Sequence, residues 1–297
     1  MNDFSLVLEK CKNLKEKKIP VVVCAQEEEL LKSICKCLKE NIVKKPILIG
    51  DKNKIETILL NEKENLDEFK IVNILDKIEA SEKAVEYILN NTGDFLIKGL
   101  VDTSIILKAI LNKKEELSQG KEIFFSHVAL VKVDKLDRLF LLSDAAMNIS
   151  PGVKEKIKII ENTLIVSKAL NIENPKIALI AAKEKVSKKM IATLDAKEIT
   201  DYYKNTNYIV EGPLALDNAI SKKSAEIKGL EGKIKGDADI LIMPNIEAGN
   251  IFYKSLTYLS NSQIAGILVG AKVPIVITSR ADNEESKFLS IALATLV

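Results

Sequence analysis

The sequence predicts an α/β protein made of two domains. At 297 residues the chain is about twice the usual domain length, so two separate cores are expected. Short apolar runs alternate with amphipathic stretches over almost the whole length, which indicates parallel βαβ units. The alternation is broken once, between Ile123 and Ser143, where two apolar runs follow each other.

Each strand expected in the first half is followed by one helix. In the clearest helix Leu30, Leu31, Ile34 and Leu38 recur at helical spacing and form one core-facing stripe. The expected strands are 19–25, 46–51, 69–75 and 94–99, and the expected helices are 27–40, one from about residue 54, 81–91 and 102–111.

The break in the alternation predicts an antiparallel hairpin. The runs FFSHVALVKV and RLFLLSD are joined by the polar turn DKLD. A change from βαβ alternation to a hairpin also marks a candidate domain boundary. After it the alternation resumes, with helices expected at 153–170, 188–203, 214–221, 249–259 and from 283, and strands at 176–182, 208–212, 239–244, 264–270 and 274–279.

Composition and charge exclude several classes of protein. Hydrophobic residues make up 47% and charged residues 29%, which is the ordinary globular range. The net charge of +2 gives no reason to expect a nucleic acid partner. The start of the chain lacks the order of a secretory signal, and the longest apolar run, IAGILVG, is too short to span a membrane. We therefore expect a cytoplasmic protein with no membrane partner.

The cysteines and the single histidine argue against a metal site. Cys11, Cys24, Cys35 and Cys37 match no zinc spacing and are expected to be reduced and structural. His127 is the only histidine, so a multi-histidine site is impossible. Neither GxGxxG nor GxxxxGK[ST] is present, so the sequence offers no dinucleotide or P-loop fingerprint. We expect no bound metal and no bound cofactor.

Arginine is rare in this chain and therefore informative. Of 44 basic residues only Arg138 and Arg280 are arginine. Where lysine is the default, an arginine can mark a place that needs a planar, bidentate phosphate donor. Arg280 ends a strand and is the better candidate, whereas Arg138 follows a turn and can be an ordinary hairpin residue. The alternative explanation for the rarity is a genome biased toward lysine codons.

Polar, glycine-containing segments follow several expected strands, where open α/β sheets bind ligands. Lys98-Gly99 precedes Asp102-Thr103 at a helix start, which favours phosphate, although a simple helix cap explains the pair as well. Ser126 and His127 lie in the hairpin, and His127 can equally be a core residue. The other segments contain Asp144 and Asn148; Gly212 and Pro213; Asn245, Glu247, Gly249 and Asn250; and Ser279, Arg280, Asp282 and Glu285.

Read together, these segments resemble the phosphate acetyl/butyryltransferase family. The similarity runs from FLIKGLVDT to the end of the chain, and SDAAMNISP, EGPLALD, DILIMPNIEAGNIFYK and TSRADNEESK carry it. Any one of these segments alone would be weak, but their order and spacing are compatible throughout. SHVALV, SDAAMN and TSRADNEESK are more similar to the butyryl branch than to the acetyl branch.

The resemblance implies a fold and an assembly. It implies two α/β domains in the isocitrate/isopropylmalate dehydrogenase-like arrangement, with an active-site cleft between them. Both chain ends would share the first domain, residues 1–125 and 279–297, and residues 126–278 would form the inserted second domain. It also implies a homo-oligomer, a dimer or a multiple of it.

The resemblance further implies a reaction, the reversible transfer of a butyryl group between coenzyme A and inorganic phosphate without an acyl-enzyme. Coenzyme A and phosphate would be substrates rather than bound cofactors. Arg280 would hold the phosphate and Ser279 would donate to the developing oxyanion. The polar residues of the other segments, from Lys98 to Asn250, would bind phosphate and coenzyme A.

The general base is the point where this sequence departs from the acetyl branch. That branch has an aspartate seven residues after the serine of the Ser-Arg pair, and here the position is Ser286. A carboxylate is still needed, because the coenzyme A thiol has a pKa of about 8.5 and must lose its proton to attack. Asp282, the acid nearest the pair, and Glu285 are both candidates.

Three other functions compete with butyryl transfer. Phosphate acetyltransferase activity differs from it only in pocket size, which the sequence does not define. A catalytically weak protein that binds coenzyme A or acyl phosphate would also fit the altered base position. A dehydrogenase is disfavoured, because no nicotinamide fingerprint or metal-binding aspartate cluster is visible in the sequence.

Overall fold

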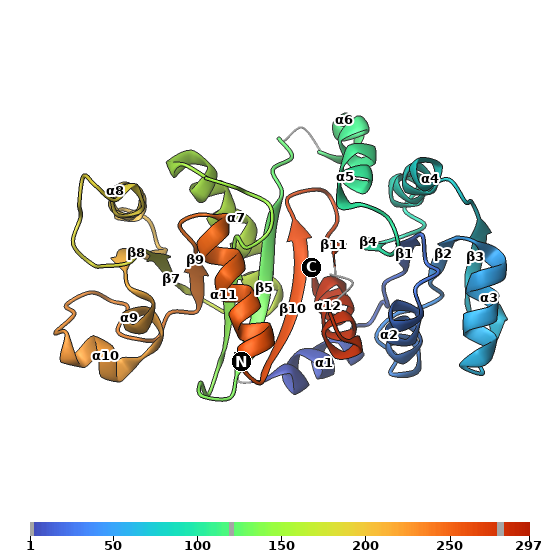
Figure 1. The fold of residues 1–297 in the computed structure, drawn as a ribbon, viewed down its shortest axis with the longest axis horizontal. Coiled ribbons are helices and arrows are strands. Elements are labelled where there is room, and N and C mark those ends of the chain that lie inside the picture. Colours follow the sequence, from blue (N-terminus) through green and yellow to red (C-terminus); the bar gives the residue numbers. More distant parts are fainter. Residues whose placement is uncertain (1–2, 119–121, 278–281) are drawn as a thin grey trace. The chain divides into compact units, whose positions relative to one another are not determined.

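The computed structural model describes residues 3–118, 122–277 and 282–297. They form two compact units, each built on its own part of the chain (Figure 1). The terminal unit comprises Phe4–Phe124 and Ile264–Val297. The central unit comprises Phe125–Gln263, and Asp3 groups with it. The expected α/β class is confirmed, whereas the domain limits expected from the sequence stay a prediction.

The terminal unit is a mostly parallel sheet with the strand order β3-β2-β1-β4-β11-β10. The strand β1 pairs in parallel with both β2 and β4, so the order reverses between β1 and β4. Strand β11 is parallel to β4, and β10 is antiparallel to β11. The strands are β1 Pro20–Val23, β2 Ile47–Gly50, β3 Lys70–Asn73, β4 Phe95–Lys98, β10 Ser262–Val269 and β11 Ile275–Val276.

Helices cover both faces of this sheet. In Figure 1, α1, α2, α3 and α12 lie below it, and α4 and α5 lie above it. All four residues of β1 and all four of β2 are buried, as expected for strands covered on both faces. The helices are α1 Phe4–Lys12, α2 Glu28–Lys39, α3 Lys52–Asn61, the 3₁₀ turn η1 Leu66–Glu68, α4 Lys77–Leu89, α5 Thr103–Asn112, α6 Lys114–Leu117 and α12 Glu284–Leu296.

Cap residues explain where helices begin. The Asp76 carboxylate accepts hydrogen bonds from the backbone N–H groups of Ile78 and Glu79, both at 2.9 Å. Helix α4 therefore begins at Lys77, four residues before the start expected from its apolar pattern. Asp51 caps α3 in the same way. Helix α1, whose Phe4, Val7 and Cys11 are buried, was not predicted from the sequence.

The central unit has the strand order β5-β6-β9-β7-β8. Strands β5 and β6 are antiparallel, with Ala129 opposite Leu142, which confirms the expected hairpin. Strands β6, β9, β7 and β8 are parallel. The elements are β5 Ser126–Val133, β6 Leu139–Ser143, α7 Val153–Ala169, β7 Lys176–Ile180, α8 Ile191–Tyr203, β8 Ile209–Leu214, α9 Leu216–Ile220, α10 Lys222–Ile227, β9 Ile240–Ile242 and α11 Ile246–Leu259.

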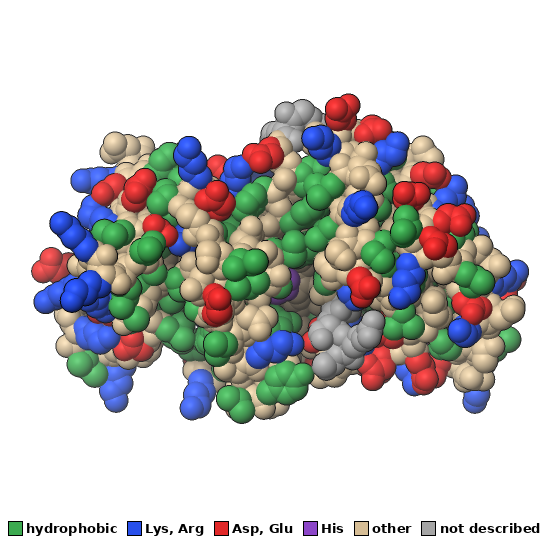
Figure 2. Space-filling view, turned by 45° about the horizontal axis from the view of Figure 1, so that its top comes forward, with side chains coloured by type: hydrophobic (Ala, Val, Ile, Leu, Met, Phe, Trp, Pro, Cys, Tyr) green, Lys and Arg blue, Asp and Glu red, His purple; other side chains and the backbone are tan. Residues whose placement is uncertain are grey.

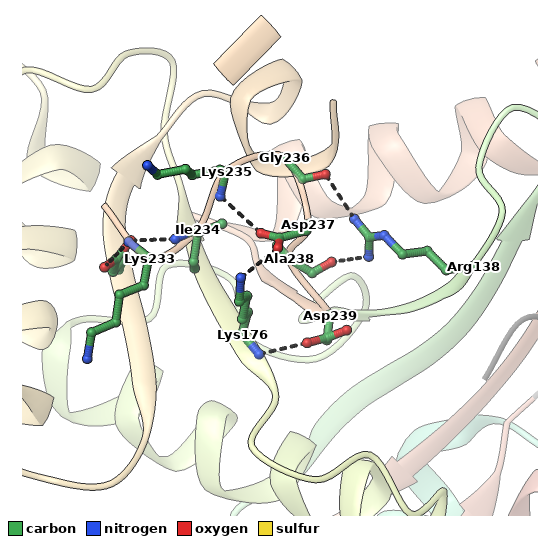
Figure 3. A network of polar contacts seen from close by, with 10 residues as sticks. Arg138, Lys176, Lys233, Ile234, Lys235, Gly236, Asp237, Ala238 and Asp239 are labelled. Carbon is green, nitrogen blue, oxygen red and sulfur yellow. Dashed lines mark hydrogen bonds and ion pairs between the residues drawn. The ribbon is translucent and has the colours of Figure 1, made fainter. Parts of the chain in front are cut away.

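Arg138 joins the hairpin to the loop before β9 (Figure 3). Its guanidinium donates hydrogen bonds to the carbonyl oxygens of Ala238 and Gly236. In the same network, Lys176 pairs with Asp237 at 2.6 Å. Burial lowers the pKa of Arg138 from its usual value. Arg138 is therefore a structural residue at the amino-terminal edge of the sheet, which agrees with the hairpin alternative.

The surface carries both signs of charge. Figure 2 shows lysine, arginine and acidic side chains interspersed across the face that it draws. Among the described residues, no helix combines the length and the apolar composition needed to cross a bilayer.

Candidate functional site

Asp144 organises the polar cluster of the central unit. It follows β6 directly and is 3% exposed. Its carboxylate accepts four hydrogen bonds, from the backbone N–H groups of His127, Ala146 and Met147 and from the Asn148 side-chain amide. An ionised carboxylate has about four acceptor sites. Asp144 therefore acts as an anchor of the loop rather than as a free base.

Asn148 and Ser126 extend this cluster to β5 and α7. The Asn148 amide donates to Asp144 Oδ2 at 2.6 Å and to the Phe125 carbonyl at 3.0 Å. Ser126 is fully buried and accepts a hydrogen bond from the Asn162 amide at 2.9 Å. Asn162 was not predicted from the sequence, because a single amide inside a helical pattern gives no signal of a partner 36 residues away.

His127 is buried in the same cluster, with 6% exposure. Its ring meets the ring of Tyr253 edge to face, with centroids 5.6 Å apart. Its backbone carbonyl accepts a hydrogen bond from the Ser143 hydroxyl at 2.8 Å. These contacts support the core alternative for His127, and its predicted part in substrate binding stays a prediction.

The start of α11 completes the cluster. Asn245 caps the helix by accepting a hydrogen bond from the Ala248 N–H at 3.0 Å. A Cβ on Gly249 would lie 2.3 Å from the Asp144 carbonyl oxygen, so only glycine permits this approach. The Asn250 amide donates to the Ala145 carbonyl at 3.1 Å. Glu247 is exposed on the first turn. Helix α11 begins at Ile246, three residues earlier than expected, so Glu247, Gly249 and Asn250 belong to its first turns.

Gly212 and Pro213 do not join the cluster. Both belong to strand β8 rather than to a loop before a helix. The Gly212 carbonyl accepts a hydrogen bond from the Thr200 hydroxyl of α8 at 3.1 Å, and Pro213 is buried. These contacts are those of a packed strand, and the predicted binding role of the pair stays a prediction.

Lys98 ends β4, and Gly99 follows it, at the point where the strand order of the terminal unit reverses. A Cβ on Gly99 would lie 2.3 Å from the carbonyl oxygen of Cys24 and 2.7 Å from that of Val23. The Gly99 N–H donates to the Val23 carbonyl at 2.9 Å. Open α/β sheets bind ligands at the carboxyl ends of strands where the order reverses. Lys98 and Gly99 therefore lie at the expected ligand-binding edge.

Helix α5 begins at the same edge. Asp102 occupies its N-cap position and Thr103 is its first residue. Within the described residues the Asp102 side chain makes no cap hydrogen bond to the helix. The first N–H groups of α5 therefore have no side-chain cap, and helix N-termini of this kind favour phosphate oxygens.

The Ser-Arg pair follows β11. Ser279 and Arg280 lie outside the described residues. Strand β11 is parallel to β4 with Val276 opposite Ile97, so the chain leaves β11 beside Lys98. Asp282 is 9% exposed, whereas Glu285 is exposed in the first turn of α12. Of the two acids considered as base, only Asp282 has a buried side chain.

The structure thus gathers the predicted residues into two groups, one in each unit. The central group contains Ser126, His127, Asp144, Asn148, Asn245, Gly249 and Asn250. The terminal group contains Lys98, Gly99, Asp102 and Thr103 at the carboxyl edge of the sheet. A parallel α/β sheet with polar groups at its carboxyl edge is the architecture of a ligand-binding α/β protein.

Comparison with known proteins identifies the class more closely. The family described as "Phosphate acetyl/butaryl transferase" matches residues 75–295. The phosphate butyryltransferase of Clostridium acetobutylicum is 43% identical over 300 residues, covering 100% of this chain and 98% of that protein. The phosphate acetyltransferase of Thermotoga maritima is 36% identical over 280 residues, covering 93% of each.

A solved structure agrees with these sequence matches. The branched-chain phosphotransacylase of Enterococcus faecalis superposes with a TM-score of 0.85 at 35% identity, covering 94% of this chain and 98% of that chain. The fold is therefore that of an acyltransferase. The chain belongs to the phosphate acetyl/butyryl transferase family. The resemblance read from its motifs is confirmed.

Proposed function

We propose that the chain catalyses the reversible transfer of a butyryl, or similarly short, acyl group between coenzyme A and inorganic phosphate. The observation that carries this proposal is the 43% identity to a phosphate butyryltransferase over the whole chain. The identity to the phosphate acetyltransferase of Thermotoga maritima is lower, 36%. This activity would place the chain in butyrate metabolism.

The terminal group supports the phosphate side of the reaction. Lys98 supplies a cation, and the N-terminus of α5 supplies N–H donors without a side-chain cap at the same edge. Ser279 and Arg280, which follow β11 in the sequence, are the proposed donors to the acyl and phosphoryl oxygens. Cationic and hydrogen-bond donors are what a departing phosphate needs.

The thiol side of the reaction needs a base. When the sulfur of coenzyme A attacks butyryl phosphate, the carbon–sulfur bond forms, the carbon–oxygen bond to phosphate breaks, and the thiol proton goes to the base. We assign this role to Asp282, whose buried side chain is sheltered from water. Glu285, exposed in the next turn, is the alternative.

The test of the proposal is thiol release measured with a coloured thiol reagent. Butyryl-CoA, isobutyryl-CoA and acetyl-CoA would each be supplied with and without phosphate. We expect phosphate-dependent release with the highest kcat/KM for a four-carbon chain. A preference for acetyl-CoA would assign the chain to acetyl transfer, since each methylene is worth only about 1–3 kcal/mol in an apolar pocket. Thiol release at the same rate with and without phosphate would refute the family reaction for this chain.

The cysteines support a reducing location. All four described cysteines are free and buried. Free thiols are typical of proteins in a reducing compartment, and this supports our proposal that the protein is cytoplasmic. We propose that coenzyme A and phosphate bind as substrates and that no metal or redox cofactor is bound.

The outward side of α11 supports a homodimer. Of its 14 residues only Gly249 and Leu256 are buried. Ile251, Tyr258 and Leu259 are 67%, 62% and 84% exposed. A helix that is apolar on more than one side is normally covered on each of them. A second copy of the chain is the partner that we propose for this surface.

Charge along α11 fits a second copy of the same helix. Glu247 and Lys254 are seven residues apart and share one face of the helix, with Ile251 between them. In an antiparallel pair related by a two-fold axis beside Ile251, Glu247 of each copy faces Lys254 of the other. Opposite charges would then flank a central apolar contact.

Charge reversal tests this pairing. Glu247→Lys and Lys254→Glu should each weaken the dimer in sedimentation equilibrium, because each places like charges opposite one another. The double variant should restore it. Glu226→Lys on exposed α10 serves as the control and should leave the dimer unchanged. A monomeric wild type, or a double variant no better than the singles, would refute the pairing.

A further inference from the structure

Lys287 is a charged side chain with no exposed surface. It lies in the first turns of α12, and its side-chain exposure is 0%. Its ammonium nitrogen lies 2.9 Å from Glu27 Oε1 and 2.8 Å from Glu29 Oε2. In the sequence, Lys287 is the last residue of the segment TSRADNEESK, and no role for it was predicted.

Stability alone is a poor explanation for this arrangement. Burying an ammonium group costs several kcal/mol, and a well-packed apolar side chain of similar size is often as stable or more stable. Burial by itself would lower the pKa of Lys287, but the hydrogen bonds to Glu29 and Glu27 and the charge attraction of the two carboxylates together raise it. The lysine is therefore charged in the folded protein, and its charge is used to hold two particular partners.

The partners of Lys287 lie at the start of α2. Glu27 occupies the N-cap position of α2, and Glu29 lies in its first turn. Two further contacts join the same helices: the Ser33 hydroxyl donates to the Glu284 carbonyl at 3.1 Å, and the Cys37 thiol donates to the Phe288 carbonyl at 3.9 Å. These contacts follow one another along α2. Together with Lys287, they define how the first turns of α12 are rotated about the helix axis and where these turns lie along α2.

Both helix starts lead to the carboxyl edge of the terminal unit's sheet. Glu27 follows β1, which pairs with β4 so that Val23 lies opposite Lys98. Asp282 precedes α12 and is buried, and Asn283 caps the helix by accepting from the Ser286 N–H at 2.8 Å. A shift of α12 along α2 would therefore move Asp282 relative to the edge that carries Lys98.

We propose that Lys287 is a positioning residue for acyl transfer, which holds Asp282 at the carboxyl edge of the sheet through Glu27 and Glu29. This inference depends on the proposed function and on Asp282 as base. Lys287 touches no substrate in this role. A misplacement of about 1 Å of a reacting group can cost on the order of 100-fold in rate, so the effect of losing the clamp should be large.

The first experiment replaces the lysine with a neutral side chain of similar length. Lys287→Met should lower kcat by about 10- to 100-fold and change the KM for butyryl-CoA by less than about threefold, because an interaction that orients the base acts in the transition state. Lys156→Met is the matched control. Lys156 of α7 is also buried, with 6% side-chain exposure, and pairs with Asp195 at 2.6 Å. It should lose stability but keep its kcat.

A second set of variants covers the case in which Lys287→Met does not fold. Glu27→Gln and Glu29→Gln each keep the lysine and an oxygen acceptor but remove one negative charge. Each should lower kcat less than Lys287→Met, and together they should approach it. If kcat falls equally in Lys287→Met and Lys156→Met, or in neither, Lys287 is an ordinary structural lysine and the inference is overturned.

A readout independent of activity separates this inference from the proposed function. Amide hydrogen exchange in the first turn of α12 should rise in Lys287→Met and stay unchanged in Lys156→Met. If the wild type shows no phosphate-dependent thiol release, the proposed function fails and exchange still tests the clamp. Unchanged exchange in α12 of Lys287→Met would refute the clamp whatever the activity.

Discussion

Gly99→Ala is the substitution whose effect follows most directly from the structure. The added methyl carbon would lie 2.3 Å from the Cys24 carbonyl oxygen and 2.7 Å from that of Val23. Normal carbon–oxygen contacts are about 3.3–3.6 Å, so the ends of β4 and β1 would have to separate by roughly 1 Å. Both obstacles are backbone atoms, which cannot turn aside as the end of a side chain can.

Gly99→Ala should lower both the stability and the activity of the protein. Overpacking of this kind destabilises by about 1–3 kcal/mol. A displacement of about 1 Å at the edge that carries Lys98 and the start of α5 can cost on the order of 100-fold in rate. We therefore expect a lower free energy of unfolding and a fall in kcat/KM of about 10- to 100-fold for butyryl-CoA and phosphate.

Urea unfolding and the thiol-release assay would measure the two effects separately. Gly152→Ala is the control, because the nearest atom to its new methyl group is the Glu155 side-chain oxygen at 3.1 Å. It should change stability by less than about 1 kcal/mol and leave kcat/KM unchanged. Wild-type kcat/KM in Gly99→Ala would show that the β4 edge takes no part in the reaction.

Three further predictions concern the base, the rare arginine and pH. Asp282→Asn should lower kcat by about 100- to 10,000-fold and Glu285→Gln by less than about threefold in the same assay, and the opposite order would make Glu285 the base. Arg138→Met should lower the free energy of unfolding in urea by about 1–3 kcal/mol, because two carbonyl groups lose their donor, and a loss of kcat without loss of stability would contradict a structural role. Burial raises the pKa of Cys35 to about 12, so the folded state holds this proton more tightly than the unfolded chain. The contribution of Cys35 to stability is thus present below about pH 8.5 and lost at higher pH, and the decline between about pH 8 and 10 should be smaller in Cys35→Ala, whereas an equal decline would refute the shift.

Periodicity predicted the elements well where one strong pattern governed them. The hairpin around DKLD formed as expected, because apolar runs joined by a polar turn leave little alternative. Helix starts were predicted less well. Asp76 and Asn245 cap α4 and α11 earlier than the apolar stripes suggested, because cap preference depends on a single side chain rather than on a repeating pattern.

Site residues could be predicted where unusual residue types cluster in the sequence. They could not be predicted where contacts between distant segments determine whether a side chain is buried. The amides around Asp144 were found because they crowd the ends of strands. Lys287 was not found, because a lysine in a polar segment is normally expected to be exposed to solvent. Its burial depends on Glu27 and Glu29, and the hydrogen bond to Glu29 joins residues 258 positions apart. No local pattern contains that information.

The discontinuous course of the chain has a consequence for biosynthesis. Strand β4 is made early, but its neighbour β11 belongs to the segment that begins at Ile264. Residues 99–274 lie between the two strands, and at about 5–20 residues per second the ribosome needs roughly 9–35 seconds to add them. During that interval β4 is an edge strand, with N–H and C=O groups open to wrong pairing. The central unit is one continuous segment and can fold during this time. The sheet of the terminal unit, in contrast, is completed only when the segment from Ile264 onward supplies β11 to pair with β4.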